Sequence, residues 1–245
     1  MATRRSQPGG GDVLLRVSHF ALLAGLCQFI PIPFADDLAG ERVRRRMVGV
    51  LLDRRGRTFD VDDVQPLYAG PGKSLIGRAG SFAKGLVLKP MKKLLRTVFF
   101  VAIIRRAILE TAEVLMLGHT IDRLLADGWL PNDASKGTLE AEAEQIVMAV
   151  SGVMSSPERR GLVTLVRRMA RVLRDRDRSD TDLPDVTDGD AEAALDDGQR
   201  RDLSKASAKL ADRLEDETGR SILARVDAAV DARLAKLQGR PAPSS

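Results

Sequence analysis

The sequence has little cysteine and little histidine, and each shortage excludes a class of protein. Cys27 is the single cysteine, so an internal disulfide framework is excluded and a reducing, cytoplasmic compartment is expected. Because Cys27 lies in an apolar run, we predict a buried structural thiol. The two histidines, His19 and His119, lie a hundred residues apart and match no zinc-binding spacing. We therefore predict no metal site.

Aromatic residues are also scarce, at 4% of the chain, and all nine fall at or before Trp129. The second half must therefore bury leucine, valine, alanine and methionine, which suits helices better than sheets. Hydrophobic content of 44% and charged content of 30% are ordinary for a folded protein. We predict an all-α fold: a helical bundle with a long central helix, followed by a C-terminal helical hairpin after an acidic linker.

The linker is the clearest boundary in the sequence. Ten acidic residues fall between Asp175 and Asp197, with only Arg176 and Arg178 to balance them. The predicted organisation is a flexible tail over residues 1–11, a main helical bundle over 12–176, an acidic linker over 177–199, a helical hairpin over 200–238 and a second tail over 239–245.

Capping residues, glycines and prolines place the individual helices. Pro90 suits the first turn of the central helix, and Gly128 is expected to end it. Thr138 and Ser156 are expected N-caps of the next two helices. Narrow apolar stripes in the last two helices suit a hairpin or a coiled coil. The predicted helices span about 13–29, 36–55, 91–127, 138–154, 157–176, 201–217 and 221–238.

The rest of the chain is organised around the stretch from Phe20 to Met47. Pro31 and Pro33 each remove a backbone donor, so a helix must end near Phe29 and a new one must begin at Ala35 or Asp36. Residues 17–34 carry no formal charge over a length at the lower limit for crossing a bilayer. The prolines weaken a spanning interpretation, and the sequence leaves a buried, an interfacial and an inserted segment all open.

One part of this stretch, FIPIPFADDLAGERVRRRM at residues 29–47, resembles a known family. It is similar to the small membrane-associated helical domain of some bacterial Era-like GTPase relatives, with their apolar segment, proline pair, acid and amphipathic helix. The resemblance covers about residues 20–47 and implies membrane association and no more. It implies no GTPase activity, because the GTPase motifs are missing from this chain.

A phosphate-binding loop is imitated at Gly70-Pro71-Gly72-Lys73-Ser74. The loop needs a glycine five residues before its Gly-Lys-Ser, so that backbone N–H groups can curl around phosphate, and Leu67 occupies that place. We interpret the motif as a glycine-rich turn. The sequence therefore predicts a protein that is not an enzyme and that binds no cofactor.

Basic residues are unevenly distributed within the net charge of +5. From Val64 to Leu109 there is no acidic residue, while nine lysines and arginines accumulate there. A basic block beside apolar surface suggests anionic lipid or nucleic acid as a partner. A solvated surface in an arginine-rich protein explains the same residues, and the composition does not choose between these interpretations.

The function expected from these patterns is peripheral attachment to an anionic membrane, with the cytoplasmic face of the cell membrane as the expected location. The alternatives are a nucleic-acid-binding protein, which is less favoured because no reader motif is present, and an interaction scaffold that binds a protein partner through the C-terminal hairpin. The candidate membrane-contact residues are Phe29, Ile30, Ile32, Phe34, Arg42, Arg44, Arg45, Arg46, Lys92, Lys93 and Arg96.

Overall fold

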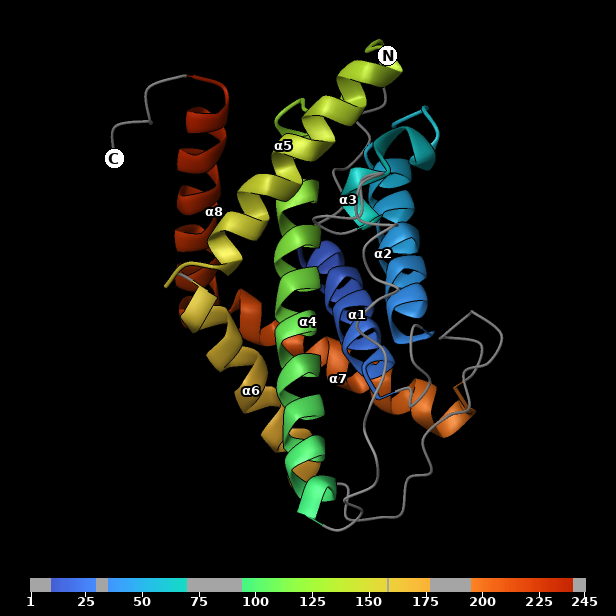
Figure 1. The fold of residues 1–245 in the computed structure, drawn as a ribbon, viewed down its shortest axis with the longest axis vertical. Coiled ribbons are helices and arrows are strands. Elements are labelled where there is room, and N and C mark those ends of the chain that lie inside the picture. Colours follow the sequence, from blue (N-terminus) through green and yellow to red (C-terminus); the bar gives the residue numbers. More distant parts are fainter. Residues whose placement is uncertain (1–9, 30–34, 70–93, 158, 177–194, 240–245) are drawn as a thin grey trace, which may run out of the picture.

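The computed structural model describes residues 10–29, 35–69, 94–157, 159–176 and 195–239, and every regular element in these ranges is helical (Figure 1). The predicted all-α fold is confirmed. The elements are α1 (Gly10–Cys27), α2 (Ala35–Arg54), the 3-10 helix η1 (Val61–Val64), α3 (Pro66–Ala69), α4 (Leu94–Ala126), α5 (Lys136–Met154), α6 (Arg159–Arg176), α7 (Asp197–Glu215) and α8 (Glu217–Leu237).

The long helix α4 runs through the centre of the bundle, as predicted, and α1 lies along it. The two helices approach closely at Gly118, where an added Cβ would come within 2.7 Å of Val17 Cγ1 and 2.9 Å of Met47 Sδ. Gly118 is therefore the point at which α1, α2 and α4 meet. Gly128 ends α4 with φ 93°, a conformation that suits glycine.

Helix α1 is largely enclosed by its neighbours α2, α4 and α7. Val17, Ala21 and Ala24 have no exposed surface, and Cys27 is 2% exposed, so the thiol is buried as predicted. The part of the uncharged run that the structure describes is thus a core helix. Among the described residues, no helix combines the length and the apolar character needed to cross a bilayer.

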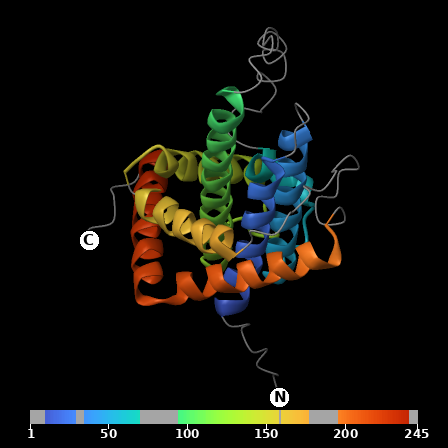
Figure 2. The ribbon, with the colours of Figure 1, turned by 90° about the horizontal axis from the view of Figure 1, so that it is seen from below.

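The two C-terminal helices form, but their apolar stripes pack mainly on the bundle rather than on each other. Helix α7 lies against α1 and helix α8 against α5, so that the pair follows two adjacent sides of the molecule (Figure 2). A single residue, Asp216, is both the C-cap of α7 and the N-cap of α8. Gly219 makes this sharp corner possible, because a Cβ there would lie 2.2 Å from the Arg213 carbonyl oxygen.

Helix α1 begins at Gly10, inside the predicted N-terminal tail and three residues before the predicted start. Three further predicted helix starts need correction, each because another residue provides the cap. Ser135, not Thr138, caps α5 through its side-chain oxygen. Asp196 and Gln199 form a capping box that starts α7 at Asp197, so the last residues assigned to the linker are helical. Leu195, also assigned to the linker, is 6% exposed and belongs to the core. Asp216 starts α8 at Glu217, four residues earlier than predicted.

Candidate membrane-binding surface

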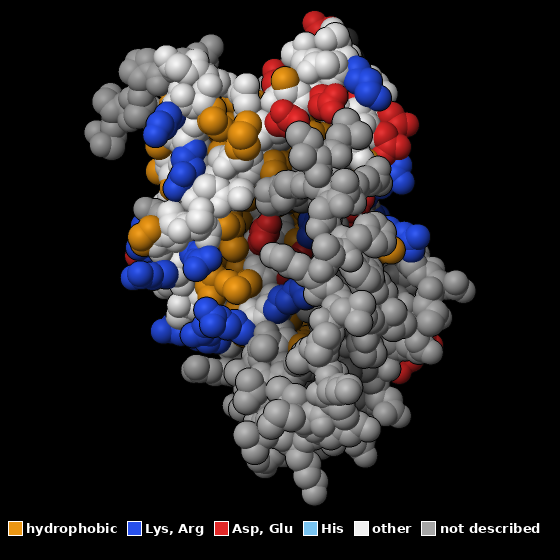
Figure 3. Space-filling model, in the orientation of Figure 1, with side chains coloured by type: hydrophobic (Ala, Val, Ile, Leu, Met, Phe, Trp, Pro, Cys, Tyr) orange, Lys and Arg blue, Asp and Glu red, His pale blue; other side chains and the backbone are white. Residues whose placement is uncertain are grey.

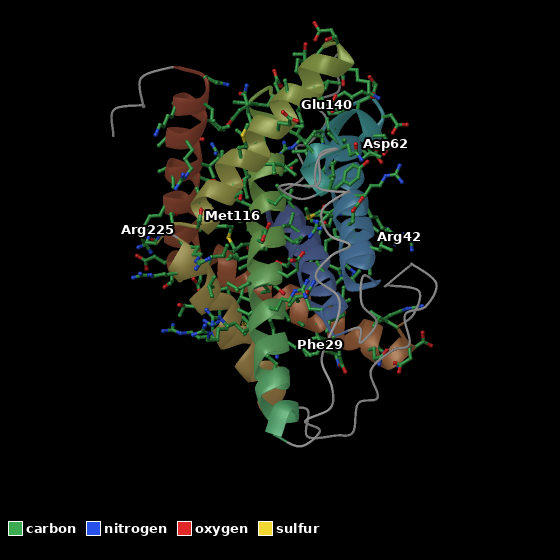
Figure 4. All side chains as sticks on the ribbon, viewed as in Figure 1. Phe29, Arg42, Asp62, Met116, Glu140 and Arg225 are labelled. Carbon is green, nitrogen blue, oxygen red and sulfur yellow. The ribbon has the colours of Figure 1, made fainter. Side chains whose placement is uncertain are left out.

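The outer side of α2 carries the predicted basic cluster and one exposed leucine. Leu38, Arg42, Arg45 and Arg46 are exposed and recur at helical spacing, whereas Ala39, Val43, Met47 and Leu51 are buried on the opposite side. Figure 4 shows Arg42 directed away from the bundle. These four exposed side chains form a continuous stripe, hereafter called the α2 stripe.

Leu38 is an apolar residue near the start of α2, yet it lies on the exposed side of the helix. Its side chain is 58% exposed, the highest value among the large exposed hydrophobic residues of the described chain. The signal that could have revealed this is its spacing from Arg42 and Arg45, four and seven residues later, which places it with the arginines. An exposed leucine at the start of a basic stripe is a feature of surfaces that touch lipid.

Arg44 does not belong to the surface cluster. Its side chain is 14% exposed, its Nη1 donates to Glu110 Oε1 of α4, and its Nε donates to the carbonyl oxygen of Tyr68 at 3.1 Å. Arg44 is therefore not part of the exposed surface to which the sequence prediction assigned it. The residue instead ties α2 to α3 and α4.

Arg45 is partly engaged and partly exposed. Its Nη2 lies 2.9 Å from Asp62 Oδ2, its guanidinium carbon lies 5.9 Å from the centre of the Tyr68 ring, and its side chain is 49% exposed. Tyr68 OH donates to Asp62 Oδ1 at 2.6 Å. This hydrogen bond, together with Arg45, lowers the pKa of Asp62. Burial and the bond to Asp62 raise the pKa of Tyr68 to about 12.

The end of α1 exposes further apolar surface. Leu26, in the last turn of α1, is 42% exposed, and Phe29 after it is half-buried at the lower end of the bundle (Figure 4). Ile30, Ile32 and Phe34 follow directly but lie outside the described residues, as do Lys92 and Lys93. The backbone of Arg96 belongs to α4, but its side chain also lies outside the description.

Glu113, a half-buried carboxylate of α4, lies near Arg44 and Glu110. Burial raises its pKa, the neighbouring Glu110 raises it further, and Arg44 opposes both effects. It borders a cavity of about 20 Å³, with room for about one water molecule. The cavity is lined by Arg44, Pro66, Leu67, Glu113, Leu117, Val147, Val150 and Ser151. A substrate or an organic cofactor would not fit into this space.

Another cluster of ionisable side chains joins α4 to α8. His119 Nε2 lies 3.1 Å from Asp227 Oδ1, and Arg123 makes two hydrogen bonds to Asp231, at 2.6 and 3.1 Å. Arg123 Nε also lies 3.1 Å from Asp227 Oδ1, so both carboxylates pair with the guanidinium of Arg123, which is the arrangement of a structural tie. Within the described part of the chain, no group of three or more His, Cys, Asp or Glu side chains could hold a metal ion.

The fold and this surface define a class: an all-α bundle with a basic stripe and an exposed apolar corner. Comparisons of the chain with protein-family models, with curated proteins and with solved structures gave no match. The phosphate-loop imitation at Gly70–Ser74 lies outside the described residues.

Proposed function

We propose that this protein attaches peripherally to an anionic membrane surface at the corner where α1 ends and α2 begins. The observation that carries the proposal is the position of Leu38, which is exposed and in line with Arg42 on the α2 stripe. Leu26, in the last turn of α1, is also exposed. The sequence between these two leucines is the apolar Pro-x-Pro segment at residues 29–34.

The two kinds of side chain act together at a membrane. Moving a leucine side chain out of water contributes about 1.5–3 kcal/mol when burial is complete. Each cationic side chain near an anionic leaflet contributes about 1 kcal/mol more. Neither contribution alone gives stable attachment, but exposed leucines beside arginines combine both. The natural target is the cytoplasmic leaflet, where anionic lipids create a negative surface potential.

The proposal assigns a binding role rather than a catalytic one. Of the predicted contact residues, Arg42, Arg45 and Arg46 are exposed on α2, and Phe29 lies at the corner, while Arg44 holds the stripe in place from behind. The proposed membrane contact therefore uses α2 as a rigid support for the arginines and the end of α1 as an apolar contact. Binding should fall with salt, because the arginines are exposed and their attraction is screened.

Flotation of the intact protein with vesicles of graded phosphatidylserine content tests the proposal. We expect binding to increase with the content of anionic lipid. Leu38→Ser and Arg42→Glu should each reduce this binding several-fold. Leu237→Ser and Arg225→Glu are matched controls, since Leu237 is 44% exposed and Arg225 is exposed, both on α8. Equal losses in the controls, or binding that ignores lipid charge, would count against the α2 stripe as the contact surface.

A further inference from the structure

A second cationic surface lies on α6 and α8, away from the α2 stripe. Figure 3 shows Lys and Arg side chains in succession down one side of the molecule, over these two helices. Among the described side chains, six cations of this surface are exposed: Arg160, Arg167, Arg168, Arg220, Arg225 and Lys236. We call this set the α6–α8 face.

The packing of α6 explains why its arginines point outward. Leu162, Val166 and Met169 are buried in the core, so the rest of the helix circumference is left for charged residues. Gly161 lies against α8, because a Cβ added there would come 3.2 Å from Ile222 Cγ1. The close approach of the two helices at this glycine brings their two sets of cations onto one surface.

Among the side chains that the structure describes on α6 and α8, acidic residues do little to neutralise this surface. The sequence of α6 contains no acid from Arg159 to Arg174. On α8, Asp227 and Asp231 are engaged inward with His119 and Arg123 of α4. The acids that remain, Asp216 and Glu217, lie at the first turn of α8, where they cap the helix or meet its dipole favourably.

We propose that the α6–α8 face binds the sugar–phosphate backbone of duplex DNA, independently of base sequence. Five of its six exposed cations are arginines, whose planar guanidinium groups match phosphate oxygens in pairs. Arg225 and Lys236 are eleven residues apart, so they are about 16 Å apart along α8 at the helical rise of about 1.5 Å per residue. This spacing lets one duplex engage several phosphates at once.

The surface chemistry favours a duplex over a lipid bilayer. On the described parts of α6 and α8, the single large hydrophobic side chain that is exposed is Leu237, at the far end of α8. Between the arginines of α8 the outward residues are small, namely Ser221, Ala224 and Ala228, which allows a phosphate backbone to approach closely. Neither described helix segment contains an aromatic residue, so stacking on single-stranded bases is not part of this recognition.

The two surfaces lie on opposite sides of the bundle. In both Figure 1 and Figure 2, α8 stands at one edge and α2 at the other, with α4 and α1 between them. Binding at one surface therefore leaves the other accessible. The DNA-binding proposal does not depend on the membrane proposal, and each can fail alone.

Fluorescence anisotropy of the full chain with a labelled DNA duplex of about two helical turns tests the inference. The test variant is Arg160→Glu/Arg167→Glu/Arg225→Glu, and the control of equal charge change is Arg201→Glu/Lys205→Glu/Arg213→Glu on α7, all six residues being exposed. We expect the test variant to weaken binding at least tenfold while the control stays within about threefold of wild type. At about 0.9 per phosphate contact, the slope of log affinity against log salt should fall by about 2 to 3 in the test variant.

Several results would overturn the inference. These are no duplex binding by the wild type at about 50 mM salt, equal losses in the two variants, or a test variant that keeps duplex binding but loses vesicle flotation. The last result would identify the α6–α8 face as a membrane surface instead. The corresponding Arg→Gln triple variant repeats the measurement with no introduced acid, and circular dichroism of each variant verifies its helix content.

Discussion

Arg55 and Asp122 form a two-point ion pair that fixes α2 against the central helix α4. Arg55 Nε donates to Asp122 Oδ1 at 2.8 Å, and Nη2 donates to Oδ2 at 2.6 Å. The Asp122 side chain is 13% exposed, so its carboxylate depends on this partner for most of its polar contacts. Because α2 carries the proposed membrane surface, the pair also fixes the position of that surface.

Removing one member of this pair should destabilise the fold measurably. We expect Arg55→Ala to lower the free energy of unfolding by about 2 kcal/mol, since it leaves a largely buried carboxylate unpaired. Urea unfolding followed by circular dichroism measures the loss. Arg225→Ala, at an exposed site, should stay within about 0.5 kcal/mol of wild type. Adding Asp122→Ala to Arg55→Ala should recover part of the loss, and a purely additive double variant would show that the two residues are not coupled.

Replacing glycine by alanine should have opposite effects on stability at Gly118 and at Gly49. Gly118→Ala should destabilise by about 1–3 kcal/mol, because the new methyl group would meet Val17 and Met47 in a packed core. Gly49 lies within α2 and has no atom within 4 Å of its ideal Cβ. Gly49→Ala should therefore stabilise by about 0.5–1 kcal/mol through helix propensity alone. Thermal unfolding of both variants compares them, and equal shifts would contradict the close contact of α1, α2 and α4.

The phenol of Tyr68 should lose its proton at an unusually high pH. It is the single tyrosine, so the phenolate absorbance of the folded protein reports on this residue alone, and we expect a pKa of about 12. Folding favours the protonated phenol, so stability is unaffected well below pH 10, the ordinary value, and is lost as the pH rises from about 10 to about 12. Asp62→Asn should move the titration back toward the ordinary value. A wild-type midpoint near the ordinary value would mean that the contact between Tyr68 and Asp62 does not persist in solution.

Cutting the chain between α6 and α7 should not separate the C-terminal helices α7 and α8 from the rest of the bundle. We expect that cleavage at a specific protease site inserted within residues 177–194 leaves two fragments that elute together, because α7 packs on α1 and α8 packs on α5. The shared core includes Leu203, Leu210 and Leu214 of α7 and Val226, Val230 and Leu234 of α8. Size-exclusion chromatography under native conditions measures the association. Leu210→Asp, at a site with no exposed surface, should weaken it, and spontaneous separation of the wild-type fragments would indicate an independent hairpin.

The sequence by itself determined the all-α class, the long central helix and the approximate positions of the helices. The physical reason is that these properties are local: prolines, glycines and the helical spacing of apolar residues act within a few turns. The burial of Cys27 followed from its apolar neighbours in the same way. Helix starts were less certain, because Ser135, Asp196 and Asp216 compete with nearby residues that could also serve as caps.

The tertiary structure alone decided which arginines of α2 are exposed and what the C-terminal helices contact. Arg44 and Arg45 are adjacent in the chain, yet Arg44 is buried because Glu110, sixty-six residues away, and the carbonyl of Tyr68 meet it. The apolar stripes of α7 and α8 would fit each other or any similar stripe. The close approach of α6 to α8 at Gly161 and the tight turn at Gly219 hold the two helices on the bundle. Such complementarity of shape depends on residues that are distant in sequence.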